Sequence, residues 1–504
     1  MANGGIIGPV NTPTADLATG VWELEEQYQA QVGGIWPPIP AIGLNSARFN
    51  SGSSDYLNRT PGSTSNRRTW TFSTWLKKSA ISGANQKIFE GGVDGNSLTD
   101  VLFKTDESFR FYSEDAGITK INLVTNSLFR DPSAWYHIVV AVDTTQGTDT
   151  NRVKLYVNGV QETSLATATY PSQNLNTSVN EASSPHQVAN GGGNLYFNGY
   201  LSEVCLIDGS QLAADSFGEF DEDSEIWKPI KVSGLTFGDN GSYLEYKQAG
   251  TSANASGMGA DTSGNTNHFT VNNLTAVDQS IDTCTNNYCV MNPLDNLFSN
   301  ATFSEGNLQY SSSRYASPTS TFGLTKGKWY FEIKCVSAAG TGGFVGITSA
   351  TATATNFEFG NTGGGRAGYV YANNGGVYGN GGTLAGAGVF AEFGDDDNDL
   401  LMMAADLDNN KIYFGKNGTW GNSQNPVNGN NALTIVALST QDSGVWRFGA
   451  MGETNNATIW QWNFGSPVHS IDSTQADDDG HGNFEYDVPA GYFALNSKNL
   501  AEYG

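Results

Sequence analysis

Two segments of the chain repeat one pattern, and this repetition constrains the fold more than any other feature. The first runs from Trp135 to Gly159 and the second from Leu400 to Gly418, and each reads as a strand, a polar turn and a second strand. In the first segment Val153, Leu155 and Val157 alternate with Lys and Tyr. A period of two places one face of a strand against a core and the other toward solvent. Because the turns are rich in Asn, Asp and Gly, we predict antiparallel hairpins in two β-sandwiches.

The charge balance restricts the partners that the chain can bind. Acidic residues number 50 against 25 basic ones, which gives a net charge of -25. A surface this negative repels phosphate and anionic lipid, so neither nucleic acid nor a membrane is expected as a partner. No stretch reaches the ~18 apolar residues that a spanning helix needs, so membrane insertion is not expected either. The 61 glycines and the 12% aromatic content are typical of many strands joined by turns.

Residues 1–40 differ from everything that follows them. A lead rich in Gly, Pro and Thr precedes the helix-favouring run GVWELEEQYQAQ. A helix of about a dozen residues is marginal alone and needs a surface to dock against. We interpret this segment as an assembly anchor that contacts other proteins through Trp22, Tyr28 and Trp36. The alternative is a disordered leader.

No arrangement of residues in the sequence predicts catalysis. The pentapeptide G-x-S-x-G is absent, and the five histidines are scattered without an H-E-x-x-H spacing. The acidic run 219–225 is contiguous. A glycosidase instead needs carboxylates that alternate along one strand, so this run is expected to be a solvated loop. We therefore expect a protein that is not an enzyme and carries no cofactor.

Clustered carboxylates and one cysteine pair raise the question of metal binding. Asp395, Asp397 and Asp399 form an acidic cluster of the kind that can bind calcium, whereas the alternative is a solvated turn. Cys284 and Cys289 could close a small disulfide loop or belong to a metal site. With no second cysteine pair and no neighbouring histidine, no metal site is predicted there, and calcium remains the one ion considered.

Aromatic residues in Gly/Asn-rich loops are the clearest candidates for ligand binding. They are Tyr369, Tyr371, Tyr378 and Trp420. Sugar rings stack on aromatic faces while Asn and Asp bind their hydroxyl groups, so these loops would suit a glycan or a protein surface. The alternative is that the four side chains pack the rim of the sandwich.

The strand order of residues 41–228 resembles the laminin G-like branch of the concanavalin A-like jelly rolls. The residues that carry this resemblance are Phe49, Tyr56 and Leu57, Trp70 to Trp75, Trp135 to Asp143, Val153 to Gly159, and Glu203 to Asp208. Residues 293–504 resemble a SPRY domain, which is another concanavalin A-like sandwich. There the residues are Trp329 to Ile333, Val345 to Ile347, Gly368 to Tyr378, Leu400 to Gly418, and Asn463 to Gly465. The fold class implied is all-β, with two tandem jelly-roll sandwiches behind a short N-terminal anchor segment and a connector at residues 229–292.

The connector also resembles a segment found in virion structural and fibre proteins of tailed bacteriophages, especially marine ones. The strings concerned are FGEFDEDSEIWKP, DTSGNTNHFTVNN and TNNYCVMNPLDN, and the leader and the ending PAGYFALNSKNL agree with this resemblance. It implies a non-enzymatic virion protein, favoured as a tail fibre or appendage adhesin that binds a host surface glycan or receptor. A capsid decoration, knob or head-fibre protein is the structural alternative. A symmetric homo-oligomer is expected, because repeated weak sites give avidity.

Overall fold

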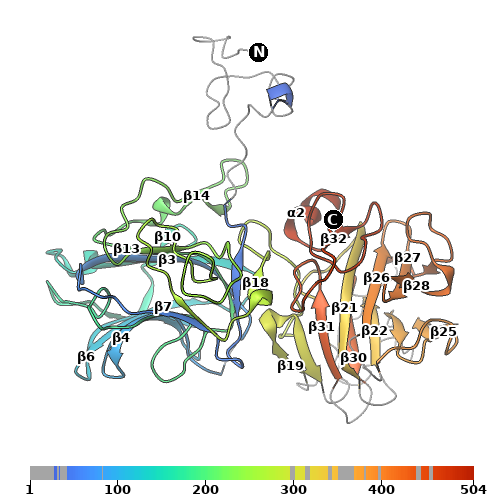
Figure 1. The fold of residues 1–504 in the computed structure, drawn as a ribbon, viewed down its shortest axis with the longest axis horizontal. Helices are drawn as coiled ribbons and strands as arrows, with labels where there is room; N and C mark the ends of the chain where they lie inside the picture. The colour runs from blue at the N-terminus through green and yellow to red at the C-terminus, as the bar shows by residue number, and fades with distance from the viewer. Residues whose placement is uncertain are drawn as a thin grey trace.

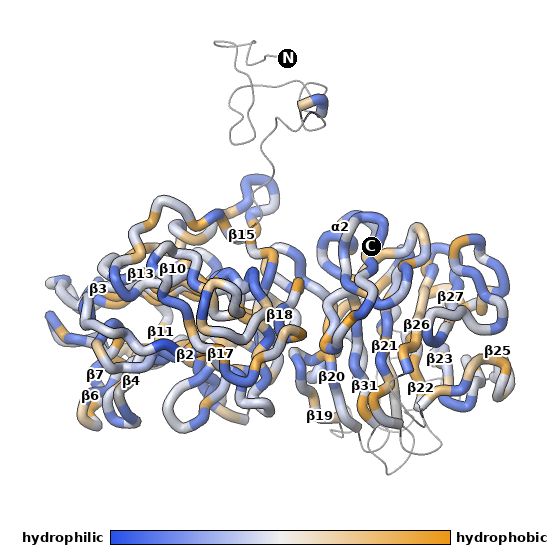
Figure 2. Tube along the Cα trace, in the orientation of Figure 1, coloured by the Kyte–Doolittle hydropathy of each residue, from blue (hydrophilic) through white to orange (hydrophobic). Residues whose placement is uncertain are grey.

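The protein is built from two β-sandwiches that lie side by side (Figure 1). The computed structural model describes residues 28–30, 33, 42–81, 83–295, 301–312, 318–338, 343–349, 368–379, 382–394, 399–438, 444–452 and 458–504. Hydrophobic residues concentrate along the strands of both bodies (Figure 2). The predicted all-β class with two tandem sandwiches is confirmed. No helix in the described part of the chain has the length and apolar character needed to cross a bilayer.

The first sandwich consists of two eight-stranded sheets. One sheet contains, in spatial order, β10 (Val160–Gln161), β9 (Val153–Val157), β8 (Trp135–Asp143), β3 (Thr69–Lys78), β13 (Gly199–Asp208), β1 (Ser46–Phe49) and β18 (Gln279–Ser280), with β16 (Ser242–Leu244) beside β13. The other contains β11 (Leu165–Thr169), β7 (Ile118–Leu128), β6 (Ser108–Asp115), β5 (Ser97–Phe103), β4 (Gln86–Asp94), β12 (His186–Val188), β2 (Tyr56–Arg59) and β17 (Thr270–Asn272). A separate hairpin pairs β14 (Gly218–Phe220) with β15 (Trp227–Pro229).

The second sandwich packs a nine-stranded sheet against a five-stranded one. The larger sheet contains β19 (Ala301–Ser304), β20 (Gln309–Ser312), β31 (Thr458–Asn463), β21 (Lys328–Ala338), β26 (Asp399–Asp406), β27 (Lys411–Lys416) and β28 (Thr419–Trp420), with β29 (Leu433–Thr434) beside β27 and β32 (Phe493–Ala494) parallel to β21. The smaller contains β25 (Gly382–Ala385), β24 (Val377–Gly379), β23 (Gly368–Ala372), β22 (Gly343–Thr348) and β30 (Arg447–Gly452). The chain ends in α2 (Ser497–Tyr503).

Both predicted hairpins form, as β8 with β9 and as β26 with β27. The expectation that one face of each is wetted is wrong. Beyond the main core, Val139 and Ala141 of β8 pack in a second cluster that includes Phe217 and Tyr243. The outer face of β27 is covered in the same way by residues near the C-terminus. Irregular segments later in the chain therefore act as an extra layer on each sandwich.

The segment assigned to a connector, residues 229–292, is built into both sandwiches. Its strands β16, β17 and β18 pair with β13, β2 and β1 of the first sandwich. Its last residues, Cys289, Val290 and Met291, are fully buried in the core of the second. The connector is thus a shared structural layer, because it supplies strands to one body and core side chains to the other.

Direct contacts also join the two sandwiches. Arg48 of β1 is completely buried and donates to the Pro467 carbonyl oxygen at 3.3 Å. The Tyr200 hydroxyl of β13 donates to the Gly306 carbonyl oxygen at 3.1 Å, and the Asn307 side-chain amide donates to the Ser79 carbonyl oxygen at 2.9 Å. Because these partners are buried backbone and side-chain groups, the junction resembles a core more than a flexible link.

Candidate binding sites

Two of the four candidate aromatic residues belong to the core of the second sandwich. Tyr369 is 2% exposed, and its hydroxyl accepts a hydrogen bond from the Val436 amide at 2.8 Å. Tyr371 is 1% exposed, and its hydroxyl donates to the Ala391 carbonyl oxygen. Both rings contact other core aromatic rings. Neither can stack on a sugar, because strand alternation points them inward from β23.

The other two aromatic candidates are partly exposed but are not brought together in one site. Tyr378 of β24 lies beside Val370, and its hydroxyl accepts from the Asn374 amide at 3.4 Å. Trp420 lies on the opposite sheet, where its ring meets Tyr330 edge-on at 6.4 Å between centroids. The four residues therefore do not form a single stacking platform.

The anchor and calcium candidates fall mainly outside the described residues. Trp22, Trp36, Asp395 and Asp397 all lie there. Tyr28 is described and is 57% exposed. The two side-chain oxygens of Asp399 accept from Asn417 at 2.8 Å and from Lys416 at 3.1 Å. Among described residues, no group of three or more His, Cys, Asp or Glu side chains is arranged to hold a metal ion.

The cysteines of the connector and the buried His137 have structural roles. Cys284 and Cys289 are both free thiols, so the sequence's small disulfide loop does not form. His137 is fully buried, and burial lowers its pKa to about 3. Its Nδ1 accepts from the indole of Trp227 at 3.0 Å, so the proton of the neutral ring lies on Nε2 and is donated to Ser73 Oγ at 2.9 Å. Since Nε2 is protonated, His137 cannot act as a base toward Ser73.

A polar recess at one end of the first sandwich is a candidate binding site. Its volume is ≈ 610 Å³, which is within the range of small-ligand pockets. Four segments meet there, and the lining residues are Arg67, Asp94, Ser97, Ser113, Glu114, Asp115, Ser172, Gln173, Asn174, Leu175, Asn176, Ser178 and Glu181. The ends of β4 and β6, the start of β5 and the loop before β12 supply most of them. Nearly every wall residue can donate or accept a hydrogen bond.

The recess holds some of its polar groups rigid and leaves others available. Arg67 fixes two walls together, since its guanidinium donates to the Thr177 carbonyl oxygen and to Glu181, both at 2.7 Å. The Asn174 backbone amide donates to the Thr144 carbonyl oxygen at 2.8 Å. In the described structure, the side chains of Asp115, Ser172 and Asn174 have no protein hydrogen-bond partner. These groups can therefore bind a ligand without first breaking a contact within the protein.

The electrostatics of the recess exclude one class of ligand. Its walls carry a single cation, Arg67, against the carboxylates Asp94, Glu114, Asp115 and Glu181. Arg67 is already paired with Glu181. A phosphate, sulfate or uronate would therefore meet uncompensated negative charge, whereas a neutral polyol or an amine would not.

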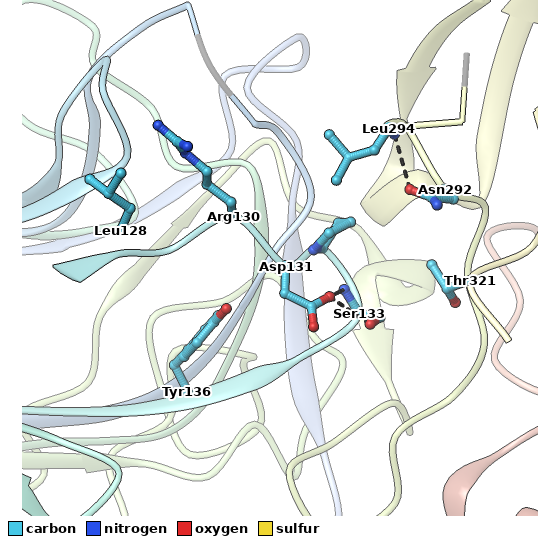
Figure 3. A pocket seen from close by; sticks show the side chains of 9 residues that line it. Leu128, Arg130, Asp131, Ser133, Tyr136, Asn292, Leu294 and Thr321 are labelled. Carbon is cyan, nitrogen blue, oxygen red and sulfur yellow. Dashed lines mark hydrogen bonds between the residues drawn. The ribbon is translucent and has the colours of Figure 1, made fainter. Parts of the chain in front are cut away.

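A second cavity lies where the two sandwiches meet (Figure 3). It measures ≈ 450 Å³ and is lined by Leu128, Arg130, Asp131, Pro132, Ser133 and Tyr136 of the first sandwich, and by Asn292, Leu294 and Thr321. Figure 3 shows the Asp131 carboxylate turned toward Ser133, whose amide and hydroxyl both donate to it, at 2.8 and 2.6 Å. The Asn292 side chain is likewise used locally, as it accepts from the Leu294 amide at 3.0 Å. This cavity offers fewer available polar groups than the recess.

Sequence reasoning missed the recess because its residues are distant in the chain. Arg67, Asp115 and Asn174 meet only through the pairing of β4, β5 and β6 and the return of the loop before β12. The one local signal is the run SQNLN at 172–176, where three polar amides surround Leu175. That composition is also typical of ordinary turns, so alone it does not indicate a site.

Comparison with known proteins supports the architecture. Residues 51–215 match the family model of the concanavalin A-like lectin/glucanases superfamily, so the first sandwich is a laminin G-like, concanavalin A-like domain. This range includes every residue that lines the recess. No curated protein sequence matches the chain.

Three solved structures illustrate the structural neighbours. Domains LG4-5 of the mouse laminin alpha1 chain are 10% identical with a TM-score of 0.27, covering 88% of this chain and 88% of that one. The SPRY domain of human HERC1 is 16% identical with a TM-score of 0.26, covering 34% of this chain and 96% of that one. A heptameric SAP-like pentraxin from Limulus polyphemus is 16% identical with a TM-score of 0.25, covering 35% of this chain and 80% of that one.

Proposed function

We propose that the chain is a non-enzymatic adhesin of a bacteriophage virion, carried on a tail fibre or related appendage, and that its first sandwich binds a host surface glycan in the polar recess. The observation that carries the glycan-binding part is the recess itself: a rigid, polar cavity inside the range that matches a lectin-type superfamily. Hydroxyl, amide and carboxylate groups around such a cavity suit the hydroxyl groups of a sugar.

The ligand class follows from the charge of the recess. Three carboxylates, Asp94, Glu114 and Asp115, have no basic partner among the recess residues, because Arg67 is paired with Glu181. We infer a neutral or amine-bearing glycan rather than an anionic one. The net charge of -25 also repels anionic glycans at longer range.

The proposed location in a virion is supported by the resemblance of the connector, the leader and the C-terminal segment to virion proteins. Within this proposal residues 1–40 attach the chain to other virion proteins, and a homo-oligomer presents several recesses at once. Multivalent presentation converts weak single sites into useful avidity. Purified particles labelled with an antibody to this chain should carry the label on a tail appendage. Label spread evenly over the capsid would favour the decoration or head-fibre alternative.

The glycan proposal is tested by an array of neutral, amine-bearing and anionic glycans probed with the full chain. We expect binding to members of the first two classes only. The double variant D115A/N174A removes two available recess groups and should weaken binding about tenfold or more, at about 1 kcal/mol for each hydrogen bond. Binding that is unchanged in this variant, or restricted to anionic glycans, would refute the recess as the site.

A matched control places the same two substitutions elsewhere. Asp472 and Asn428 are exposed side chains on the second sandwich, so D472A/N428A should bind as the parent does. The same samples test the non-enzymatic part of the proposal. Incubation with a bound polysaccharide should release no reducing sugar, and measurable release would contradict it.

A further inference from the structure

The β14–β15 hairpin is held firmly against the first sandwich by one tryptophan. The Trp227 indole donates to His137 at 3.0 Å, and the two rings stack at 5.9 Å between centroids. Gly159 lies so close that a Cβ added there would be 2.3 Å from the indole. Phe220 meets the same ring edge-on at 4.8 Å. The base of the hairpin is therefore fixed in position.

The turn of the hairpin is also ordered by local hydrogen bonds. The Asp221 carboxylate accepts from the backbone amides of Asp223 at 3.2 Å and Ser224 at 3.0 Å. Lys228 reaches back across the strands to Asp221 at 2.9 Å and to Glu219 at 3.4 Å. These contacts set the shape of the turn before any partner binds, which lowers the entropy cost of docking.

This ordered hairpin presents apolar side chains to solvent. Phe220 is 49% exposed and Ile226 is 66% exposed. Exposed apolar side chains are ordinary when scattered singly, but a fixed projection that carries two of them can insert into an apolar pocket. We name Phe220 and Ile226 the hairpin patch.

The charge around the hairpin patch selects the kind of partner. Five carboxylates stand on the hairpin, those of Glu219, Asp221, Glu222, Asp223 and Glu225, against the single ammonium group of Lys228. Two copies of the hairpin would repel each other, so a second copy of this chain is not the occupant. We propose that the hairpin docks into a partner protein whose apolar pocket is bordered by Lys and Arg. Apolar burial would supply affinity, and the acidic rim would supply orientation and a fast association rate.

Synthetic peptides test this proposal on the full chain. Three sets of labelled peptides, each about 15 residues long, are compared by fluorescence anisotropy. The basic apolar set contains Arg, Leu and Trp, the basic polar set contains Arg and Ser, and the acidic apolar set contains Glu, Leu and Trp. We expect only the basic apolar set to bind appreciably, with weaker binding at higher salt because the rim contacts are screened. Failure of every basic apolar peptide to bind, or equal binding of the acidic apolar set, would overturn the proposal.

Two variants separate docking from general charge attraction. F220S/I226S removes the apolar side chains and keeps all five carboxylates, so it should weaken binding of the basic apolar peptides at least tenfold. L384S/V427S changes two exposed apolar residues of the second sandwich and should leave binding unchanged. Equal binding by F220S/I226S and the parent would show that charge alone attracts the peptides, which overturns the proposal. An unchanged far-UV circular dichroism spectrum and a cooperative thermal transition verify that each variant is folded.

Discussion

Arg48 is the residue whose replacement should most clearly disrupt the joint between the sandwiches. Its side chain is fully buried and donates to the Val277 carbonyl oxygen at 2.6 Å and to the Pro467 carbonyl oxygen at 3.3 Å. It also faces two carboxylates, Asp278 at 3.4 Å and Glu305 at 3.5 Å. The guanidinium therefore links β1 to the connector and to the second sandwich.

The substitution R48M keeps the length of the side chain and removes its charge. It leaves the Asp278 carboxylate, which is 9% exposed, without its buried cation. Removing one partner of a buried ion pair costs about 3 to 5 kcal/mol, and two carbonyl oxygens lose their donor as well. Since Glu305 is 21% exposed and keeps contact with water, we expect a loss near the lower end, about 3 kcal/mol.

Urea denaturation monitored by Trp fluorescence, together with calorimetry, measures this loss. The parent should unfold with strongly coupled sandwiches, and R48M should separate the unfolding of the two bodies into distinct transitions. The triple variant R48M/D278N/E305Q removes the stranded charges and should recover part of the stability. A loss below about 1 kcal/mol for R48M, with the transition unchanged, would refute the view that this residue couples the sandwiches.

Three further predictions concern buried groups. G159A should release Trp227, because a Cβ would lie 2.3 Å from the indole at a backbone φ of 80°, and we expect a loss of about 1 to 3 kcal/mol with a shift in Trp emission. E332Q should cost about 1 to 3 kcal/mol in urea denaturation, because the buried Glu332 carboxylate accepts from the Glu485 amide at 3.0 Å and the Tyr486 amide at 2.9 Å and so fixes the C-terminal segment. Burial lowers the pKa of three histidines, which are His137 at about 3, His186 at about 3 and His469 at about 4. Their stabilising effect is complete above about pH 6.5 and is lost as the pH falls toward the folded pKa. Burial also raises the pKa of Asp55, Glu203 and Glu332 to about 7, which offsets most of this loss down to about pH 4.5. Stability measured by urea denaturation should therefore change little from pH 6.5 to 4.5 and fall below pH 4.5 by about 2 to 3 kcal/mol per pH unit. A flat profile below pH 4.5 would contradict the assignment of neutral buried histidines.

The sequence predicts the strands well because their pattern is local. Alternation in Val153 to Val157 and in Lys411 to Lys416 depends on neighbouring residues alone, and both segments form the expected hairpins. The covering layers are not predictable in this way. Tyr413 sits on the face that alternation assigns to solvent, yet it is fully buried by Tyr492 and its neighbours from an irregular segment some eighty residues away. Burial there depends on where a distant loop returns, which no local period encodes.

The candidate binding residues show the same difference between local and long-range information. A Gly/Asn-rich setting suggested that Tyr369 and Tyr371 face a ligand, but strand β23 directs both rings into the core, where each hydroxyl finds a backbone partner. The composition of a segment shows which residues it contains, but it does not show which face of a strand each side chain occupies. The recess has the opposite character, since its residues are ordinary polar turn residues that become a site only when three turns and Arg67 converge.

The shared connector has a consequence for how the two sandwiches can act. The second sandwich needs Cys289, Val290 and Met291 to complete its core, and the first needs β16, β17 and β18 from the same segment. A fragment that starts at residue 293 would lose these three fully buried side chains. Burial of a Val or Met side chain stabilises a fold by roughly 1.5 to 3 kcal/mol. Neither body is therefore a self-sufficient module, because each depends on the same connector.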